Sequence, residues 1–141
     1  MAVFDFSDRV QAKGKDSFVV EQAGGGSELT AVCVEEGKVD GRSRTYAVGT
    51  AAGELIQYKV GSKKRPVRLF DGASSPVSCL AWCGAVLAWA DSRHVRLLSV
   101  PNQTALCFIN APTGIPMDSA SSCFTPCSLY WEAQSRLLVG W

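Results

Sequence analysis

Residues 78–100 constrain the fold most, because three short apolar runs in this segment are separated by two tight polar breaks. The runs are 79–82, Val86–Ala90 and 95–100. Their lengths are those of strands and not of helices, and a glycine or an aspartate marks each break. A short buried helix over 80–90 is the competing interpretation, which Gly84 and the absence of capping residues disfavour. The segment therefore predicts three consecutive strands joined by tight turns.

The same strand pattern extends in both directions along the chain. Further strands are predicted at 18–20, 29–34, 45–50, 54–60, 67–70, 104–109, 127–131 and 137–141. Pro66 and the charges around it place 67–70 at the edge of a sheet. Val86–Ala90 is apolar at every position, which predicts a strand buried on both faces between stacked layers.

An internal repeat connects these strands. Leu80-Ala81-Trp82 recurs 49 residues later as Leu129-Tyr130-Trp131. We align 87–89 with 139–141, and 46–60 with 86–100 without a gap, so that Gly49 takes the place of Trp89. In this alignment four tryptophans occupy repeated positions, and we expect them to pack between strands: Trp82, Trp89, Trp131 and Trp141. Four short strands in a unit of about 40–50 residues predict the blades of a β-propeller.

The predicted fold is all-β, a partial β-propeller of four-stranded antiparallel blades in an incomplete ring. Its predicted parts are a blade tail at 1–24, blades at 25–73 and 74–111, a long loop at 112–125 and half a blade at 126–141. Propellers close with at least four blades. Each open end would leave about half a dozen large apolar side chains uncovered, at about 1.5–3 kcal/mol each. We therefore expect the isolated chain to aggregate or to remain partly unfolded.

Segments 79–100 and 126–141 resemble a known family, most clearly in Leu87-Ala88-Trp89-Ala90-Asp91 and in Leu138-Val139-Gly140-Trp141. They are similar to the amino-terminal WD-repeat-like propeller of the vacuolar protein sorting 41 family, a subunit of the HOPS tethering complex. The loops at 35–43 and 110–125 depart from the family pattern. The resemblance implies a non-catalytic interaction scaffold in a vesicle-tethering subunit, which acts in transport from endosome to lysosome or vacuole and in membrane fusion.

The same resemblance implies partners and a location. The partners are other tethering-complex subunits, a Rab-family GTPase and SNARE proteins. The location is cytoplasmic, with peripheral association at the membrane of the late endosome, lysosome or vacuole. The family protein also carries a helical solenoid and a zinc-binding RING-type module, and neither is present in this sequence.

Composition agrees with a cytosolic globular domain. The 141 residues include 47% hydrophobic side chains and carry a formal net charge of +1, which argues against a nucleic-acid partner. Asp5 and Asp8 lie where a secretory signal would be basic and then apolar. No apolar run approaches the roughly 20 residues of a membrane-spanning helix.

Four cysteines form the sharpest chemical pattern. Cys79 and Cys83, like Cys123 and Cys127, are four residues apart and could together supply four thiolates to zinc. Zinc modules prefer Cys-x-x-Cys, and both pairs lie at the start of repeated strands, so we favour packing over metal binding. The alternatives to the scaffold remain a Cys-rich zinc-binding module or a propeller domain of an unrelated enzyme or scaffold.

The remaining candidates are basic or catalytic. Lys63, Lys64, Arg65 and Arg68 could contact anionic lipid or a partner, although a solvated hairpin is the favoured interpretation. His94 has no serine or acid at the spacing of a catalytic triad, and no glycine-rich phosphate loop is present. We therefore expect no enzymatic activity and no cofactor.

Overall fold

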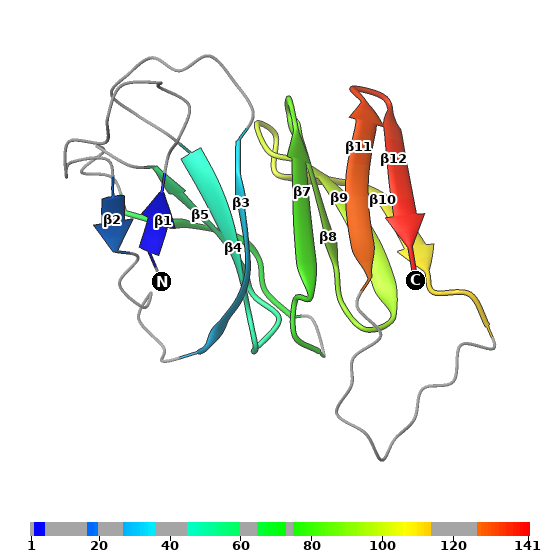
Figure 1. Cartoon of the computed structure of the whole chain (residues 1–141), viewed down its shortest axis with the longest axis horizontal. Coiled ribbons are helices and arrows are strands. Elements are labelled where there is room, and N and C mark those ends of the chain that lie inside the picture. Colours follow the sequence, from blue (N-terminus) through cyan, green and yellow to red (C-terminus); the bar gives the residue numbers. More distant parts are fainter. Residues whose placement is uncertain are drawn as a thin grey trace.

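The computed structural model describes residues 2–4, 17–19, 27–35, 45–59, 65–72, 75–113 and 127–141. Within these ranges every regular element is a β-strand, and no helix occurs (Figure 1). The strands are β1 (Ala2–Phe4), β2 (Ser17–Val19), β3 (Leu29–Val34), β4 (Thr45–Thr50), β5 (Leu55–Lys59), β6 (Val67–Phe70), β7 (Cys79–Cys83), β8 (Val86–Ala90), β9 (His94–Ser99), β10 (Thr104–Asn110), β11 (Ser128–Ala133) and β12 (Arg136–Gly140).

Two four-stranded antiparallel sheets form the centre of the structure, in the orders β3-β4-β5-β6 and β7-β8-β9-β10. Strand pairs β1-β2 and β11-β12 form two smaller sheets. The first strands β3, β7 and β11 lie side by side, and the row of sheets is open (Figure 1). The prediction of four-stranded antiparallel sheets is confirmed.

The predicted segments compare with these sheets as follows. The two four-stranded sheets fall within 25–73 and 74–111, although the blade boundaries themselves stay predictions. Most of the predicted 112–125 loop lies outside the described residues. The edge position predicted for β6 is confirmed, because this strand ends its sheet. Cys83, which lies outside the predicted run 79–82, is the last residue of β7, and the turn is formed by Gly84 and Ala85.

Strand β8 is buried on both faces, as its sequence predicted. Leu87 and Trp89 face the preceding sheet, whereas Ala88 and Ala90 lie on the opposite face, and all four are at most 2% exposed. The tight turn before β8 contains Gly84 at φ 54°, a left-handed conformation that favours glycine. The Trp82 indole Nε1 donates a hydrogen bond to the carbonyl oxygen of Gly84 at 3.0 Å.

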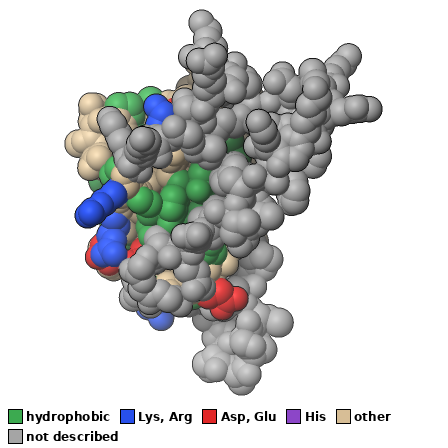
Figure 2. All heavy atoms as spheres, turned by 90° about the vertical axis from the view of Figure 1, so that its left-hand side faces the viewer, with side chains coloured by type: hydrophobic (Ala, Val, Ile, Leu, Met, Phe, Trp, Pro, Cys, Tyr) green, Lys and Arg blue, Asp and Glu red, His purple; other side chains and the backbone are tan. Residues whose placement is uncertain are grey.

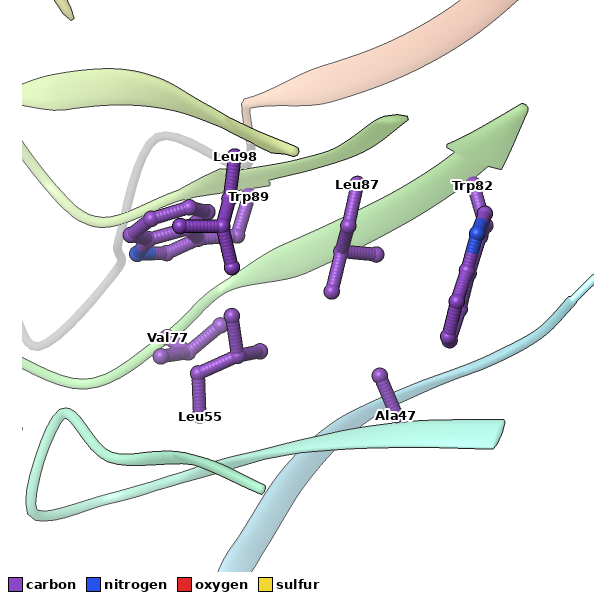
Figure 3. Close-up of a cluster of buried hydrophobic side chains, with 7 residues drawn as sticks. All are labelled: Ala47, Leu55, Val77, Trp82, Leu87, Trp89 and Leu98. Carbon is purple, nitrogen blue, oxygen red and sulfur yellow. The ribbon is translucent and has the colours of Figure 1, made fainter. Parts of the chain in front are cut away.

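The main hydrophobic core lies between the two four-stranded sheets. It contains Ala47 and Leu55 from the first sheet, and Val77, Trp82, Leu87, Trp89 and Leu98 from the second sheet and the segment before it (Figure 3). The first sheet contributes both small and large side chains at this junction, and the second sheet contributes both tryptophans. Close packing of such complementary faces is what holds stacked sheets together.

Two further clusters cover the outer faces of these sheets. Ala90, Val95 and Cys127 are buried between the second sheet and β11-β12, with Val139 and Trp141 packed against them. Tyr46, Val48 and Ile56 form the third cluster, on the face of the first sheet that turns away from the second. Seen from that end of the molecule, hydrophobic side chains gather near the centre and charged side chains lie around them (Figure 2).

The strand register corrects our gap-free repeat alignment. Ala47 faces the following sheet, whereas Leu87 faces the preceding one, so these two residues are not equivalent. Tyr46 is the counterpart of Leu87, because it pairs with Val34 and Tyr58 as Leu87 pairs with Trp82 and Leu98. Val48 therefore takes the place of Trp89, and Gly49 takes the place of Ala90.

A difference in turn length explains this error. The backbone N–H of Thr50 donates to the carbonyl of Glu54 across three intervening residues, whereas Asp91 donates to His94 across only two. The gap-free alignment therefore holds for β5 and β9 but is one residue out for β4 and β8.

The alignment of Trp141 with Trp89 is also wrong. Trp131 pairs with Leu137 as Trp82 pairs with Leu87, which confirms that Trp82 and Trp131 are equivalent. A β-bulge between Trp131 and Ala133 adds one residue to β11. Val139 consequently occupies the position of Trp89, and Trp141 occupies that of Asp91.

Val77 joins the two large sheets. Its backbone N–H donates to the carbonyl of Thr50 at 3.1 Å, and its own carbonyl accepts from Thr30 Oγ1 at 2.6 Å. Its side chain is fully buried over Gly49. A Cβ atom at Gly49 would lie 2.5 Å from Cβ of Val77, so only glycine fits beneath this clamped residue.

Gly49→Ala is expected to lower the free energy of unfolding by about 1–3 kcal/mol through overpacking. The Gly49→Ala/Val77→Gly double variant should lose less than the sum of its single variants, because Val77→Gly removes the clashing Cβ. Urea unfolding in sucrose, which strengthens apolar burial, measures both effects. Gly140→Ala is the control, since its new Cβ would meet only the Ser128 hydroxyl, which can rotate away. Strict additivity would contradict the clash.

Candidate functional site

Asp91 lies in the turn between β8 and β9, where its carboxylate accepts hydrogen bonds and forms ion pairs. Its carboxylate is 1% exposed, and Oδ1 accepts hydrogen bonds from the backbone N–H groups of Arg93 and His94, each at 2.8 Å. His94 Nδ1 lies 3.1 Å from Oδ1, and an Arg96 guanidinium nitrogen lies 3.1 Å from Oδ2. The buried negative charge is therefore compensated within the second sheet.

The structure places the Asp91 carboxylate beside His94, a contact that the sequence spacing did not indicate. The other ring contact of His94 is Phe108, whose centroid is 4.7 Å away. A triad needs a hydroxyl or thiol nucleophile on the second ring nitrogen, and a phenyl ring supplies neither. The pair closes a turn, with Asp91 equivalent to Thr50, whose Oγ1 accepts from the Glu54 N–H at 3.1 Å.

Arg96 extends this cluster to the neighbouring sheet. Its guanidinium carbon lies 5.0 Å from the ring centroid of Phe70 in β6 and 5.3 Å from that of Phe108 in β10. Phe70 in turn contacts Trp89, with the ring centroids 5.2 Å apart. Cation–π contacts of this kind contribute about 0.5–2 kcal/mol each. The second sheet is thus fixed to strand β6 of the first sheet by cation–π and aromatic contacts.

The four tryptophans all lie against a neighbouring sheet. Trp82 and Trp89 are buried in the main core, and Trp131 and Trp141 are half-buried. Trp131 Nε1 donates to the carbonyl of Ala81 at 3.2 Å, which links β11 to β7. Trp141 packs against the cluster that contains Cys127. These positions support a packing role.

The candidate zinc cysteines are divided by the structure. Cys79 and Cys127 lie together in the cluster between the second sheet and β11-β12. Cys83 is the last residue of β7, and four residues of extended strand place it about 13 Å from Cys79. Zinc–sulfur bonds are about 2.3 Å long, so Cys79 and Cys83 do not share an ion. Cys123 lies outside the described residues. Within the described ranges no three histidine, cysteine or acidic residues form a metal-binding group.

Metal analysis of the purified chain is expected to find far less than one equivalent of zinc. The reason is the separation of Cys79 from Cys83, together with the apolar surroundings of Cys79. One equivalent of zinc that disappears in the Cys79→Ser variant would contradict this assignment.

Buried thiol and phenol groups predict a loss of stability in alkali. Burial raises the pKa of Cys79 from 9.0 to about 12, with the neighbouring Cys127 adding to the shift. Burial also raises the pKa of Cys127 and, with Tyr58 adding, that of Tyr46 from 10.0 to about 12. Above pH 9 the unfolded chain releases protons that the folded chain retains. The stabilisation is therefore complete below about pH 9 and is lost as the pH rises to about 12.

We expect the free energy of unfolding to fall between pH 9 and 12 by up to about 1.4 kcal/mol per pH unit for each such group. The Cys79→Ala variant should show a shallower fall, first visible between pH 9 and 10. Urea unfolding at a series of pH values measures this slope, with Cys107→Ala in the exposed strand β10 as the matched control. Parallel curves for the wild type and Cys79→Ala would contradict the prediction.

The basic residues are only partly described. Arg65 is exposed, and Lys63 and Lys64 lie outside the described residues. Arg68 is paired with Glu54 at 3.1 Å and with Asp71 at 2.8 Å. Such exposed ion pairs contribute little stability, but they lower the net positive charge that Arg68 presents. A lipid or partner contact at these residues stays a prediction.

Stacked four-stranded antiparallel sheets, with their first strands side by side, define blades of a β-propeller. The Vps41 β-propeller family model, which carries the description "Vps42 beta-propeller", matches residues 26–141. The chain therefore belongs to the Vps41 β-propeller family, and its fold is part of that propeller.

Curated relatives carry the same name. The chain is 24% identical over 116 residues to Vacuolar protein sorting-associated protein 41 homolog from Solanum lycopersicum and, over the same length, to that from Arabidopsis thaliana. It is 24% identical over 99 residues to Vacuolar protein sorting-associated protein 41 from Schizosaccharomyces pombe. These matches cover 80%, 80% and 70% of the chain but only 11% of each relative. The chain thus spans about a tenth of the length of these relatives.

Among the described residues, no helix is long and apolar enough to span a membrane.

Proposed function

We propose that this chain is a non-catalytic interaction scaffold, part of the propeller of a protein that acts in vacuolar protein sorting. The family membership and the names of the relatives support this role. The structural observation that best supports a scaffold role is the Val77 junction, which fixes adjacent sheets through two hydrogen bonds and a buried side chain. Sheets fixed in this way hold the turns at their ends in constant relative positions, which is how a propeller presents loops to partners.

The finer proposal is that the parent protein is a subunit of a vesicle-tethering complex. It acts in transport from endosome to lysosome or vacuole, and its partners are other tethering subunits, a Rab-family GTPase and SNARE proteins. It works in the cytoplasm and associates peripherally with the membrane of the late endosome, lysosome or vacuole. The resemblance in the β8 and β11-β12 segments supports this proposal.

Two experiments test these proposals in turn. The genomic sequence on both sides of the coding segment should encode further four-stranded blades and a helical solenoid, and the absence of both would contradict the tethering role. The parent protein, tagged at its own genomic locus and purified from cross-linked cells, should bring down other tethering subunits. Recovery should fall when Asp91→Ala disrupts the second sheet and should persist with Asp71→Ala at an exposed position. Recovery that Asp91→Ala leaves unchanged would contradict a scaffold role for these sheets.

Membrane contact through the basic residues is a separate proposal. Liposome flotation with and without acidic lipid tests it, and binding should depend on acidic lipid and weaken with salt. Binding that depends on neither acidic lipid nor salt would contradict the lipid proposal without affecting the scaffold proposal.

A further inference from the structure

Two cysteines from different sheets meet where the second sheet packs against β11-β12. Strands β7 and β11 lie side by side at this junction (Figure 1). Cys79 is the first residue of β7 and the cross-strand partner of Ala90. Cys127 directly precedes β11, is 3% exposed and belongs to the same buried cluster as Ala90. Ala90 therefore neighbours both cysteines.

The alternation of side chains along the two strands turns these cysteines toward each other. Leu80 and Trp82 of β7 pack in the main core, so Cys79 lies on the opposite face of the strand, which is turned toward β11. Leu129 and Trp131 of β11 face the second sheet, and the Trp131 indole reaches the Ala81 carbonyl at 3.2 Å. Cys127 is two residues before Leu129 and lies on the same face.

The two thiols also act on each other. Burial raises the pKa of Cys79, and the charge of Cys127 and a side-chain hydrogen bond with it add to this effect. Burial raises the pKa of Cys127 as well, and the hydrogen bond with Cys79 offsets part of this rise. The backbone N–H of Leu129 also donates to the Cys79 sulfur. These contacts make the two sulfur atoms close neighbours across the junction.

We propose that Cys79 and Cys127 are an oxidation site, at which a peroxide joins their sulfur atoms in a disulfide that links the second sheet to β11. Cys79 is the less buried of the two and reacts first, so that its sulfur becomes a sulfenic acid and one water leaves. The Cys127 sulfur then attacks the Cys79 sulfur, and the hydroxyl group leaves with the Cys127 proton as a second water. Two S–H bonds and the O–O bond break, while one S–S bond and two O–H bonds form. The thiols are oxidised and the peroxide is reduced.

The environment of the pair makes this reaction conditional. The thiolate is the reactive form of cysteine, and burial keeps both thiols protonated near neutral pH. The pair should therefore stay reduced until a peroxide is present. Disulfides in reducing compartments are usually transient or redox-sensing. The inference goes beyond the proposed scaffold function and does not depend on it.

Disulfide mapping on the full-length chain tests the proposal. One variant keeps Cys79 and Cys127 and has the other cysteines changed to serine, and the matched control keeps Cys83 and Cys127 instead. Cys83 lies on the same face of β7 as Cys79 but about 13 Å away along the strand. Hydrogen peroxide should link the two cysteines within each chain of the first variant, with the loss of two titratable thiols, and dithiothreitol should restore them. The control should form far less of the intramolecular link, measured by mass spectrometry of unreduced tryptic peptides.

Unfolding separates the folded arrangement from chance encounters. The two variants would close loops of nearly equal length, so in concentrated urea they should form the link equally well. The oxidised first variant should also unfold at a higher urea concentration than its reduced form, because the link constrains the unfolded chain. Equal yields of the link in the two variants without urea would overturn the proposal. Links that form mainly between chains, or an unchanged urea midpoint after oxidation, would also overturn it.

Discussion

Replacing Asp91 with alanine is expected to lower the free energy of unfolding by about 3–5 kcal/mol, the usual cost of removing one partner of a buried ion pair. The variant leaves the partly buried Arg96 guanidinium, which lies near two phenyl rings, without its counter-charge. It also leaves the Arg93 and His94 N–H groups without their carboxylate acceptor. This loss is a large fraction of the about 5–15 kcal/mol by which a typical domain is stable. Urea unfolding in sucrose, monitored by tryptophan fluorescence, measures the change.

Two control variants separate charge from hydrogen bonding. Asp91→Asn retains an oxygen that can accept from the turn N–H groups and should lose less stability than Asp91→Ala. Asp71→Ala removes an acid from an exposed pair and should change stability by less than about 1 kcal/mol. Equal effects of Asp91→Ala and Asp71→Ala would show that the buried cluster contributes nothing.

Trp89→Ala is the second change with a large expected effect, again about 3–5 kcal/mol. The side chain is 2% exposed and packs in the main core, with its ring centroid 5.2 Å from that of Phe70. Its indole Nε1 has no hydrogen-bond partner among the described residues, so the expected loss comes from packing. The same urea titration applies.

Trp89→Phe should therefore retain a larger part of the stability than Trp89→Ala. Tyr130→Ala is the surface control, because Tyr130 is 65% exposed, and it should change stability little. A Trp89→Ala variant as stable as Tyr130→Ala would show that the two large sheets do not depend on this junction.

Much of the fold could be predicted from sequence, because apolar runs of strand length and tight turns report local structure directly. The burial of β8 on both faces was predictable from its five apolar residues. The exact repeat was not. A one-residue difference between the turns at Thr50 and Asp91, and a bulge after Trp131, shift the equivalences without changing the apolar pattern.

The candidate site was less predictable because its contacts are not local. Thr30 and Val77 are 47 residues apart, and the Phe70–Arg96 contact joins strands of different sheets. The only local signal was Asp91, an acid in a tight turn after an apolar strand. The aggregation or partial unfolding expected for the isolated chain stays a prediction, and a monodisperse monomer with a cooperative melt would contradict it.

The position of Val77 has a consequence for how the protein forms during synthesis. Val77 precedes β7, yet its hydrogen bonds and side chain complete the sheet formed by β3–β6. The first sheet therefore reaches its full set of contacts only after the ribosome has released the linker that follows it. A boundary drawn at residue 73 separates the repeats in sequence but divides a unit of cooperative folding. Co-translational folding of the first sheet should therefore be complete only once Val77, which lies beyond that boundary, has left the ribosome.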